Sequence, residues 1–244
     1  MKTLFTTLLA SVAGFMIVTS PAAHAATEGS GKVVSETRAV SDFDAIAQSG
    51  DIDILVRQGA REGVQIQAED NLLPLIETVV EQRSAGRTLM IRFRKGENIR
   101  SHKPVKVTVD VIHLTSVATA GSGDVVVEAL KTPSLRLALS GASDAKLQGL
   151  TTEHFEIHIS GSGDVAARGS ATQLKLSIAG SGDADLADLT ADDVSVRIAG
   201  SGDAKVTANK ALSVSVAGSG DVSYGGAATA VKTSVAGSGS IQRR

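Results

Sequence analysis

A row of regularly spaced aspartates is the largest group of residues in this sequence that could do chemistry. Copies of Gly-Ser-Gly-Asp follow one another through the second half of the chain, with a variant at 141–144 and a last copy at 237–240 that lacks the Asp. The aspartates are Asp124, Asp144, Asp164, Asp183, Asp203 and Asp221. If each repeat is one coil of a stack, neighbouring carboxylates lie roughly 5 Å apart along one edge.

Two roles fit such a row, and they differ in what offsets the repulsion between neighbouring carboxylates. Ca²⁺ ions could bridge successive carboxylates, but one carboxylate per coil is few for an ion that takes about six to eight oxygen ligands. Alternatively, each Asp accepts hydrogen bonds from N–H groups of its turn. The ligand number favours the turn role. The calcium-binding edge is kept as an alternative, and the sequence predicts neither another metal site nor a cofactor.

A second group, His154, Glu156 and His158, alternates along one expected strand and so projects from one face. Neighbouring positions two apart lie roughly 6.6 Å from each other, a distance that one metal ion can bridge. The positions expected to lie beside them in the next coil are Gln173, Lys175 and Ser177, which are poor ligands. The sequence therefore predicts a solvated face here.

Catalytic signatures are missing from the chain. It contains no G-x-S-x-G, Walker A or H-E-x-x-H motif, and none of the Gly-Ser-Gly-Asp turns opens a helix as a phosphate-binding loop would. A β-helical enzyme acting on polysaccharides would need acidic and basic residues clustered on one face. The basic residues of the repeats are scattered among Ser and Ala. We therefore expect a protein that is not an enzyme, with a carbohydrate-active enzyme as the alternative.

The segments between the turns predict the fold. Before each glycine, apolar residues alternate with mostly polar ones, as in Leu135, Leu137 and Leu139. Period two is typical of a strand with one buried face, and a period near 20 residues is typical of a solenoid. The sequence predicts an all-β, single-stranded parallel β-helix with about 20 residues per coil and two or three short strands in each coil.

The glycines of the repeats are predicted to form the turns between strands. Glycine adopts positive φ without a steric penalty, and a coil of this length must bend sharply. The predicted turn-forming residues are Gly121, Gly123, Gly161, Gly163, Gly180, Gly182, Gly200, Gly202, Gly218 and Gly220.

The first half of the mature chain lacks the motif but continues the alternating pattern. Residues 33–112 are predicted to form irregular coils, and residues 113–244 the repeat coils. Within the first part, the Leu- and Val-rich segment 71–82 predicts one short helix that begins near Asn71 and Pro74 and covers one end or flank of the core.

The chain begins with the features of an export signal. Lys2 is followed by an apolar stretch and by small residues at Ala23 and Ala25, which predicts a signal peptide at 1–25 and a flexible mature N-terminus at 26–32. The apolar stretch is shorter than the roughly 20 residues needed to span a membrane, and no second apolar stretch follows it. The absence of cysteine excludes disulfides. Aromatic residues make up 2% of the chain and the formal net charge is -2, which argues against nucleic-acid binding.

Three segments together carry a resemblance to a known family: "FDAI" followed by "GDIDILVRQG" within 43–59, "NLLPLIETVVEQRSAGRTLMIRF" at 71–93, and the Gly-Ser-Gly-Asp coils. The chain resembles, over about residues 33–240, the bacterial "putative autotransporter adhesin" family known as the head GIN domain, a domain of unknown function. The resemblance implies an exported β-helical domain with no established catalytic residues.

These observations predict a non-catalytic envelope or surface protein, an adhesin-like binding or scaffold module in the periplasm or on the surface of a Gram-negative bacterium. Its expected partner is an envelope macromolecule or a glycan. The alternatives are a carbohydrate-active enzyme, a calcium-binding envelope protein, and a self-assembling protein that forms homo-oligomers through its coil ends.

Overall fold

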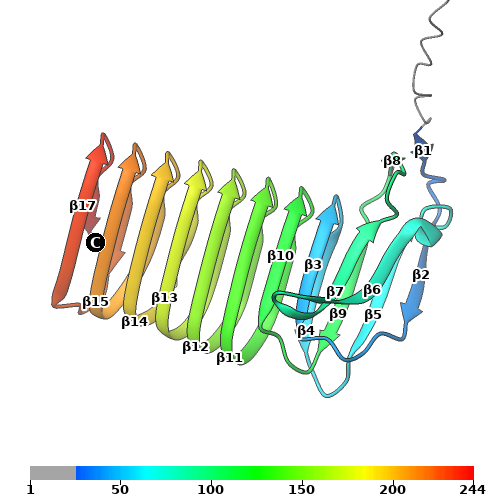
Figure 1. The fold of residues 1–244 in the computed structure, drawn as a ribbon, viewed down its shortest axis with the longest axis horizontal. Coiled ribbons are helices and arrows are strands. Elements are labelled where there is room, and N and C mark those ends of the chain that lie inside the picture. The colour runs from blue at the N-terminus through cyan, green and yellow to red at the C-terminus, as the bar shows by residue number, and fades with distance from the viewer. Residues whose placement is uncertain (1–25) are drawn as a thin grey trace, which may run out of the picture.

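The repeats form a stack of coils that makes up most of the molecule (Figure 1). The computed structural model describes residues 26–244. Each central coil contains one long, bent strand of 15 to 17 residues, in place of the two or three short strands that were expected. These strands are β11 (Val125–Gly141), β12 (Ala145–Gly161), β13 (Val165–Gly180), β14 (Ala184–Gly200) and β15 (Ala204–Gly218). They pair in parallel, which confirms the predicted all-β parallel solenoid.

The core of the coils follows from the alternation in the sequence. Positions that align through the parallel register stack directly on one another, as Ile157, Leu176 and Val196 do. These side chains are buried, while the polar residues between them face outward. Because the inward rows are mostly apolar, every coil shares its core with the coil on either side.

The C-terminal end of the stack is formed by three short strands. They are β16 (Val222–Gly225), β17 (Ala230–Gly237) and β18 (Ile241–Arg243). Strands β16 and β17 both pair in parallel with β15, and β18 pairs with β16. The last complete coil therefore lies at the end of the molecule, as Figure 1 shows for β17.

The N-terminal region continues the coils only in part. Strands β10 (Ser116–Gly121), β3 (Ala45–Gly50) and β7 (Gly86–Phe93) extend one wall in parallel order, and β4 (Asp53–Gln58) lies between β11 and β9 (Lys106–Val111) in the other. The remaining strands pair antiparallel: β6 (Ile76–Arg83) pairs with β7, β5 (Gly63–Glu69) pairs with β9, and β2 (Val33–Arg38) pairs with β5. The change of direction ends the solenoid on this side.

The predicted helix at 71–82 is wrong. Only Leu73–Leu75 form one turn of 3₁₀-helix, with Pro74 inside it, and the chain from Ile76 onward is strand β6. Thr78, Val79 and Val80 are β-branched and favour an extended backbone. The chain then reverses at 84–85, so that β6 pairs antiparallel with β7 along its whole length. Pairing with β7, which the spacing of the apolar residues does not reveal, therefore makes this segment a strand and not a helix.

Residues 26–32 contact the rest of the domain, and the flexibility expected for this segment stays a prediction. Strand β1 (Thr27–Glu28) pairs in parallel with β8 (Ile99–Arg100), and the N–H of Gly31 donates a hydrogen bond to Glu69. The predicted signal peptide at 1–25 lies outside the described residues. Within residues 26–244, no helix has the length and apolar character needed to cross a membrane.

Candidate functional site

The aspartate row forms a ladder of hydrogen bonds along one edge of the solenoid. The N–H of Asp164 donates to Oδ1 of Asp144 at 2.8 Å, and the N–H of Asp183 donates to Oδ1 of Asp164 at the same distance. The same contact joins Asp203 to Asp183 at 2.7 Å and Asp221 to Asp203 at 2.8 Å. Each carboxylate thus accepts a backbone N–H from the next coil.

The ladder is longer than the repeat motif indicates. It begins at Asp53, whose Oδ1 accepts the N–H of Asp124 at 3.2 Å, and it ends at Ser240, whose N–H and hydroxyl both donate to Asp221. Sequence reasoning missed Asp53. The signal was present, because Gly50 aligns with Gly121 and Asp53 follows Gly50 by three residues, as Asp124 follows Gly121.

The two glycines of each turn have different roles. The first, as at Gly200 with φ +143°, occupies a conformation that other residues rarely adopt. The second, as at Gly202, does not have positive φ, but a Cβ atom there would lie 2.1 Å from the carbonyl oxygen of Gly182 in the preceding coil. The second glycine is therefore needed for close stacking rather than for a left-handed backbone.

The arrangement of acidic and histidine side chains bears on the two possible metal sites. In the part of the chain that the structure describes, no three His, Asp or Glu side chains lie close enough together to hold a metal ion. Along the aspartate row, Oδ1 of each ladder carboxylate already accepts an N–H group. Calcium bridging would have to depend mainly on Oδ2, and it stays a prediction.

The His154, Glu156 and His158 group lies as the register predicted, beside Gln173, Lys175 and Ser177. Nζ of Lys175 donates to Oε1 of Glu156 at 2.6 Å, and Nε2 of His158 lies 3.1 Å from the same oxygen. The hydrogen bond from Lys175 holds the pKa of Glu156 below its ordinary value, against the opposing effect of burial. Glu156 is therefore hydrogen-bonded to Lys175 and lies beside His158.

A shallow trough runs across the coils beside this group. Its volume is about 680 Å³, and it extends from β11 to β17. Nδ1 of His154 and Oε1 of Gln173 lie 3.2 Å apart in its lining, and the small side chains of Ala211 and Ala230 line its C-terminal part. The other polar and charged residues of its lining are Ser134, Glu156, Lys175, Asp193, Ser195, Ser213 and Lys232. Sequence reasoning missed the trough, because hollows depend on side-chain volume across several coils.

Further hollows lie elsewhere on the described part of the solenoid. One, of about 430 Å³, follows the outer side of the aspartate row beside Lys146 and Asp185. Another, of about 650 Å³, has four Thr residues in its lining together with His113 and Lys131, and a third, of about 480 Å³, is lined by residues that include Gln148 and Arg168. The repeats thus present hollows on several faces, and the trough along β11 to β17 has the largest volume of these.

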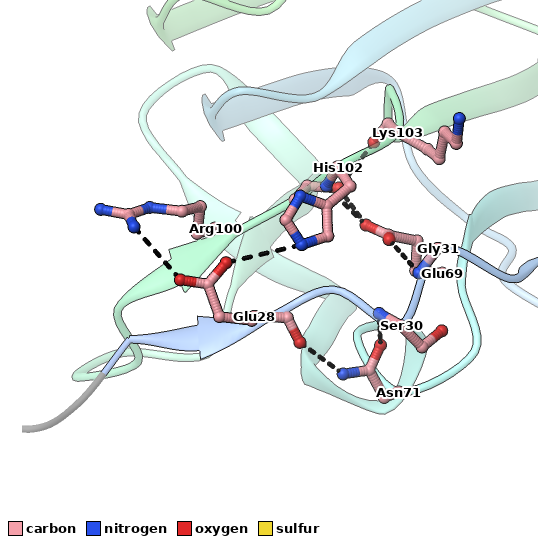
Figure 2. Close-up of polar contacts among 9 residues, drawn as sticks. Glu28, Ser30, Gly31, Glu69, Asn71, Arg100, His102 and Lys103 are labelled. Carbon is pink, nitrogen blue, oxygen red and sulfur yellow. Dashed lines mark hydrogen bonds and ion pairs between the residues drawn. The ribbon is translucent and has the colours of Figure 1, made fainter.

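Glu69 is the most engaged buried carboxylate of the N-terminal region (Figure 2). It is 0% exposed and accepts hydrogen bonds from Oγ of Ser101 at 2.7 Å, the N–H of His102 at 2.9 Å and the N–H of Gly31 at 2.6 Å. The Ser101 hydroxyl contributes most to holding the pKa of Glu69 below its ordinary value, with the backbone donors adding to it against desolvation. Glu69 therefore joins three separate chain segments.

Asn71 makes a second attachment for the same N-terminal segment, as Figure 2 shows. Its Oδ1 accepts the N–H of Ser30 at 2.9 Å, and its Nδ2 donates to the carbonyl oxygen of Glu28 at 2.8 Å. The carboxylate of Glu28 in turn lies 3.2 Å from Nη1 of Arg100 and 3.6 Å from Nε2 of His102. These contacts join the N-terminal segment to two other parts of the same chain, which indicates a structural anchor.

Comparisons with known proteins agree with this architecture. Residues 42–228 match the family model described as "Putative auto-transporter adhesin, head GIN domain". A crystal structure of a "putative adhesin" from Bacteroides fragilis is 27% identical over 89% of this chain and 100% of its own, with a TM-score of 0.84. No curated protein matches the chain.

Two further solved structures, both from Parabacteroides distasonis, have the same fold. One is titled a "putative lipid binding protein" and the other a "putative adhesin". They are 23% and 24% identical, each over 90% of this chain and 100% of its own, and both have a TM-score of 0.70. At this level of identity the similarity supports the fold alone.

Proposed function

The chain belongs to the head GIN domain family of "putative auto-transporter adhesins", and from this premise we propose that it is an exported, non-catalytic binding protein that holds a neutral glycan in the trough along β11 to β17. The trough is the observation that carries the proposal. It is open and crosses successive coils, so it suits an extended polymer better than an enclosed small molecule.

The charges in the trough favour a neutral ligand. Lys175 and Lys232 are balanced by Glu156 and Asp193, and the Lys175–Glu156 pair is directly hydrogen-bonded. A polyanion would meet too few unpaired cations for a strong electrostatic attraction. Hydroxyl groups of a sugar chain can instead donate to and accept from imidazole, amide, carboxylate and serine side chains.

The residues of the trough give less support to an enzyme that cleaves such a polymer. A glycosidase needs one carboxylic acid that is protonated near neutral pH, usually because its pKa is raised. The pKa of Glu156 is instead lowered by Lys175, so this group stays ionised. A carbohydrate-active enzyme remains the alternative, and turnover of a polysaccharide by the purified protein would favour it.

Export to the periplasm or the cell surface is part of the proposal. It is supported by the basic, apolar and small-residue segments at 1–25 and by the adhesin description of the family. Either compartment would bring the trough into contact with envelope or extracellular polysaccharides.

The test compares two glutamine substitutions. Gln173→Ala removes an amide from the trough, and Gln148→Ala removes an exposed amide from another face. Binding is measured by biolayer interferometry on immobilised neutral polysaccharides and on uronic-acid polysaccharides as the anionic set. We expect binding to the neutral set, weakened about fivefold by Gln173→Ala and unchanged by Gln148→Ala. Failure to bind any neutral polymer, or equal effects of both substitutions, would contradict the proposal.

A further inference from the structure

The last coil of the solenoid leaves its core uncovered. Every residue of β17 is exposed, although the aligned strand β15 is buried at each inward position. Val231 and Val235 align with Leu212 and Val216, which are each 1% exposed. The two valines are 38% and 42% exposed. The inward row of β17, which consists of Val231, Thr233 and Val235 and aligns with the covered row of β15, therefore meets solvent at this end.

The backbone of β17 is also unpaired on its outer side. Its pairing in the described residues is with β15 alone, so the opposite edge presents a row of free N–H and C=O groups. Such an edge is a template for another strand. A second copy of the chain always brings an identical edge, and two identical edges can pair antiparallel about a two-fold axis.

We propose that a second copy of this chain covers the open end, with the β17 strands of the two copies paired antiparallel about Thr233. In this register Val231 lies opposite the partner's Val235, so the two aliphatic rows join into one core across the dimer. Lys232 lies opposite the partner's Ser234, and the two lysines do not face each other. Because this register places apolar residues opposite apolar residues of an identical strand, a second copy of the chain fits the open end.

The basic residues near the C-terminus do not oppose this contact. Nη2 of Arg244 donates to the carbonyl oxygen of Val206 at 3.2 Å, and Nη2 of Arg243 donates to the carbonyl oxygen of Gly226 at 3.1 Å. Both guanidinium groups bind backbone carbonyls of coils within their own chain. Lys232 is then the main charge on β17, and its predicted neighbour across the axis is neutral.

The opposite end of the solenoid limits the assembly to a dimer. There the coils give way to the antiparallel strands β6, β5 and β2, and the inward residues Leu72 and Ile66 are 0% exposed. The edge strands β2 and β6 at that end carry Val33 and Val79, which are 48% and 41% exposed, but both strands run antiparallel to their neighbours and do not continue the parallel coil edge that β17 presents. A contact between two C-terminal ends uses the same patch on both copies and closes without leaving a further free patch.

The first measurement is sedimentation equilibrium of the exported, full-length mature protein over a wide concentration range. We expect a reversible monomer–dimer equilibrium. Ser234→Lys should weaken dimerisation about tenfold, because the new lysine of each copy would face Lys232 of the other copy. Ser234→Asp should strengthen dimerisation, because each new carboxylate would face that lysine. Ser215→Lys, at the aligned exposed position on β15, is the control and should change nothing. A monomer at all concentrations, or equal effects of the two lysine substitutions, would overturn the proposal.

A cross-link tests the register directly, since the chain has no native cysteine. Thr233→Cys places two thiols opposite each other at the two-fold axis, where facing Cβ atoms of an antiparallel pair lie about 5 Å apart, close to disulfide geometry. We expect oxidation to give a covalent dimer on a non-reducing gel, and Ser215→Cys to remain monomeric. Cross-linking of both variants to the same extent would indicate random collision and would contradict the register.

Discussion

The repeat coils and the N-terminal region are stabilised in different ways. In β11 to β15 the same kinds of contact recur in every coil: aligned aliphatic rows, a glycine turn and one step of the aspartate ladder. In the N-terminal region each important contact occurs once, as with Glu69 and its three donors. The coils depend on close stacking between neighbours, and the N-terminal region depends on single polar anchors.

The largest effect should come from disturbing the stacking of the coils. Gly202→Ala places a Cβ atom 2.1 Å from the carbonyl oxygen of Gly182, so the two coils must separate at the turn. We expect a loss of about 3 kcal/mol in the free energy of unfolding, measured by chemical denaturation.

Gly149→Ala, in strand β12, is the matched control within the repeat coils. The nearest atom to its Cβ would be 3.7 Å away, in Ala129, which is an ordinary contact distance. We expect almost no change in the free energy of unfolding. If both substitutions had the same effect, close approach at the turns would not limit the stability of the solenoid.

The sequence allowed the coils to be predicted in detail because their contacts repeat. Period two specified the buried face, and the spacing of the aspartates specified which residues of neighbouring coils lie side by side, as for His154 and Gln173. Any single coil could be ambiguous, but the same pattern in successive coils excludes most other arrangements.

The N-terminal region could not be predicted to the same level. The segment 71–82 has apolar residues at spacings that fit a helix or a strand, and its state was decided by pairing with β7. Glu69 gave no signal as an anchor, because its donors come from residues some 30 or more positions away along the chain. The trough likewise depends on which side chains of several coils are small, as at Ala211 and Ala230.

A smaller, local effect is expected when the anchor of the N-terminal region is changed. Glu69→Gln removes the charge that accepts three hydrogen bonds and introduces an NH₂ group facing N–H donors. We expect faster amide hydrogen exchange in residues 27–31 and 99–103, with unchanged protection in β11 to β15. Glu97→Gln, at an exposed carboxylate of the same region, is the control and should leave exchange unchanged. Faster exchange throughout the coils would show that the two regions are not independent.

The same anchor should make the N-terminal region sensitive to acid. Because the pKa of Glu69 is lower in the folded protein than its ordinary value of 4.5, ionisation of this group favours the folded state. Its contribution is present above the ordinary pKa and is lost as the pH falls through the lowered, folded value. After correction for intrinsic exchange, residues 27–31 of the native protein should approach the behaviour of Glu69→Gln in that acidic range. A difference between the two proteins that did not change with pH would contradict this.

The smallest effect is expected for Asp203→Asn, and its size decides what the aspartate row does. Asparagine keeps an Oδ1 atom that can accept the N–H of Asp221, while one negative charge between Asp183 and Asp221 is removed. If the row only forms turns, the free energy of unfolding should change by less than about 0.5 kcal/mol, or rise slightly because repulsion is relieved. Asp203→Ala, which removes the acceptor, should cost about 1 kcal/mol.

A thermal melt with EDTA and then with millimolar Ca²⁺ completes this test. With a turn role, the melting temperature of the native protein should not respond to calcium. If calcium bridges the carboxylates, the melting temperature should rise by many degrees, because an ion that binds the folded state stabilises it by mass action. Asp203→Asn should then reduce that rise, since it removes one charged ligand from the middle of the row. The free energies of unfolding and the melting temperatures therefore together distinguish an aspartate row that only shapes the turns from one that binds calcium.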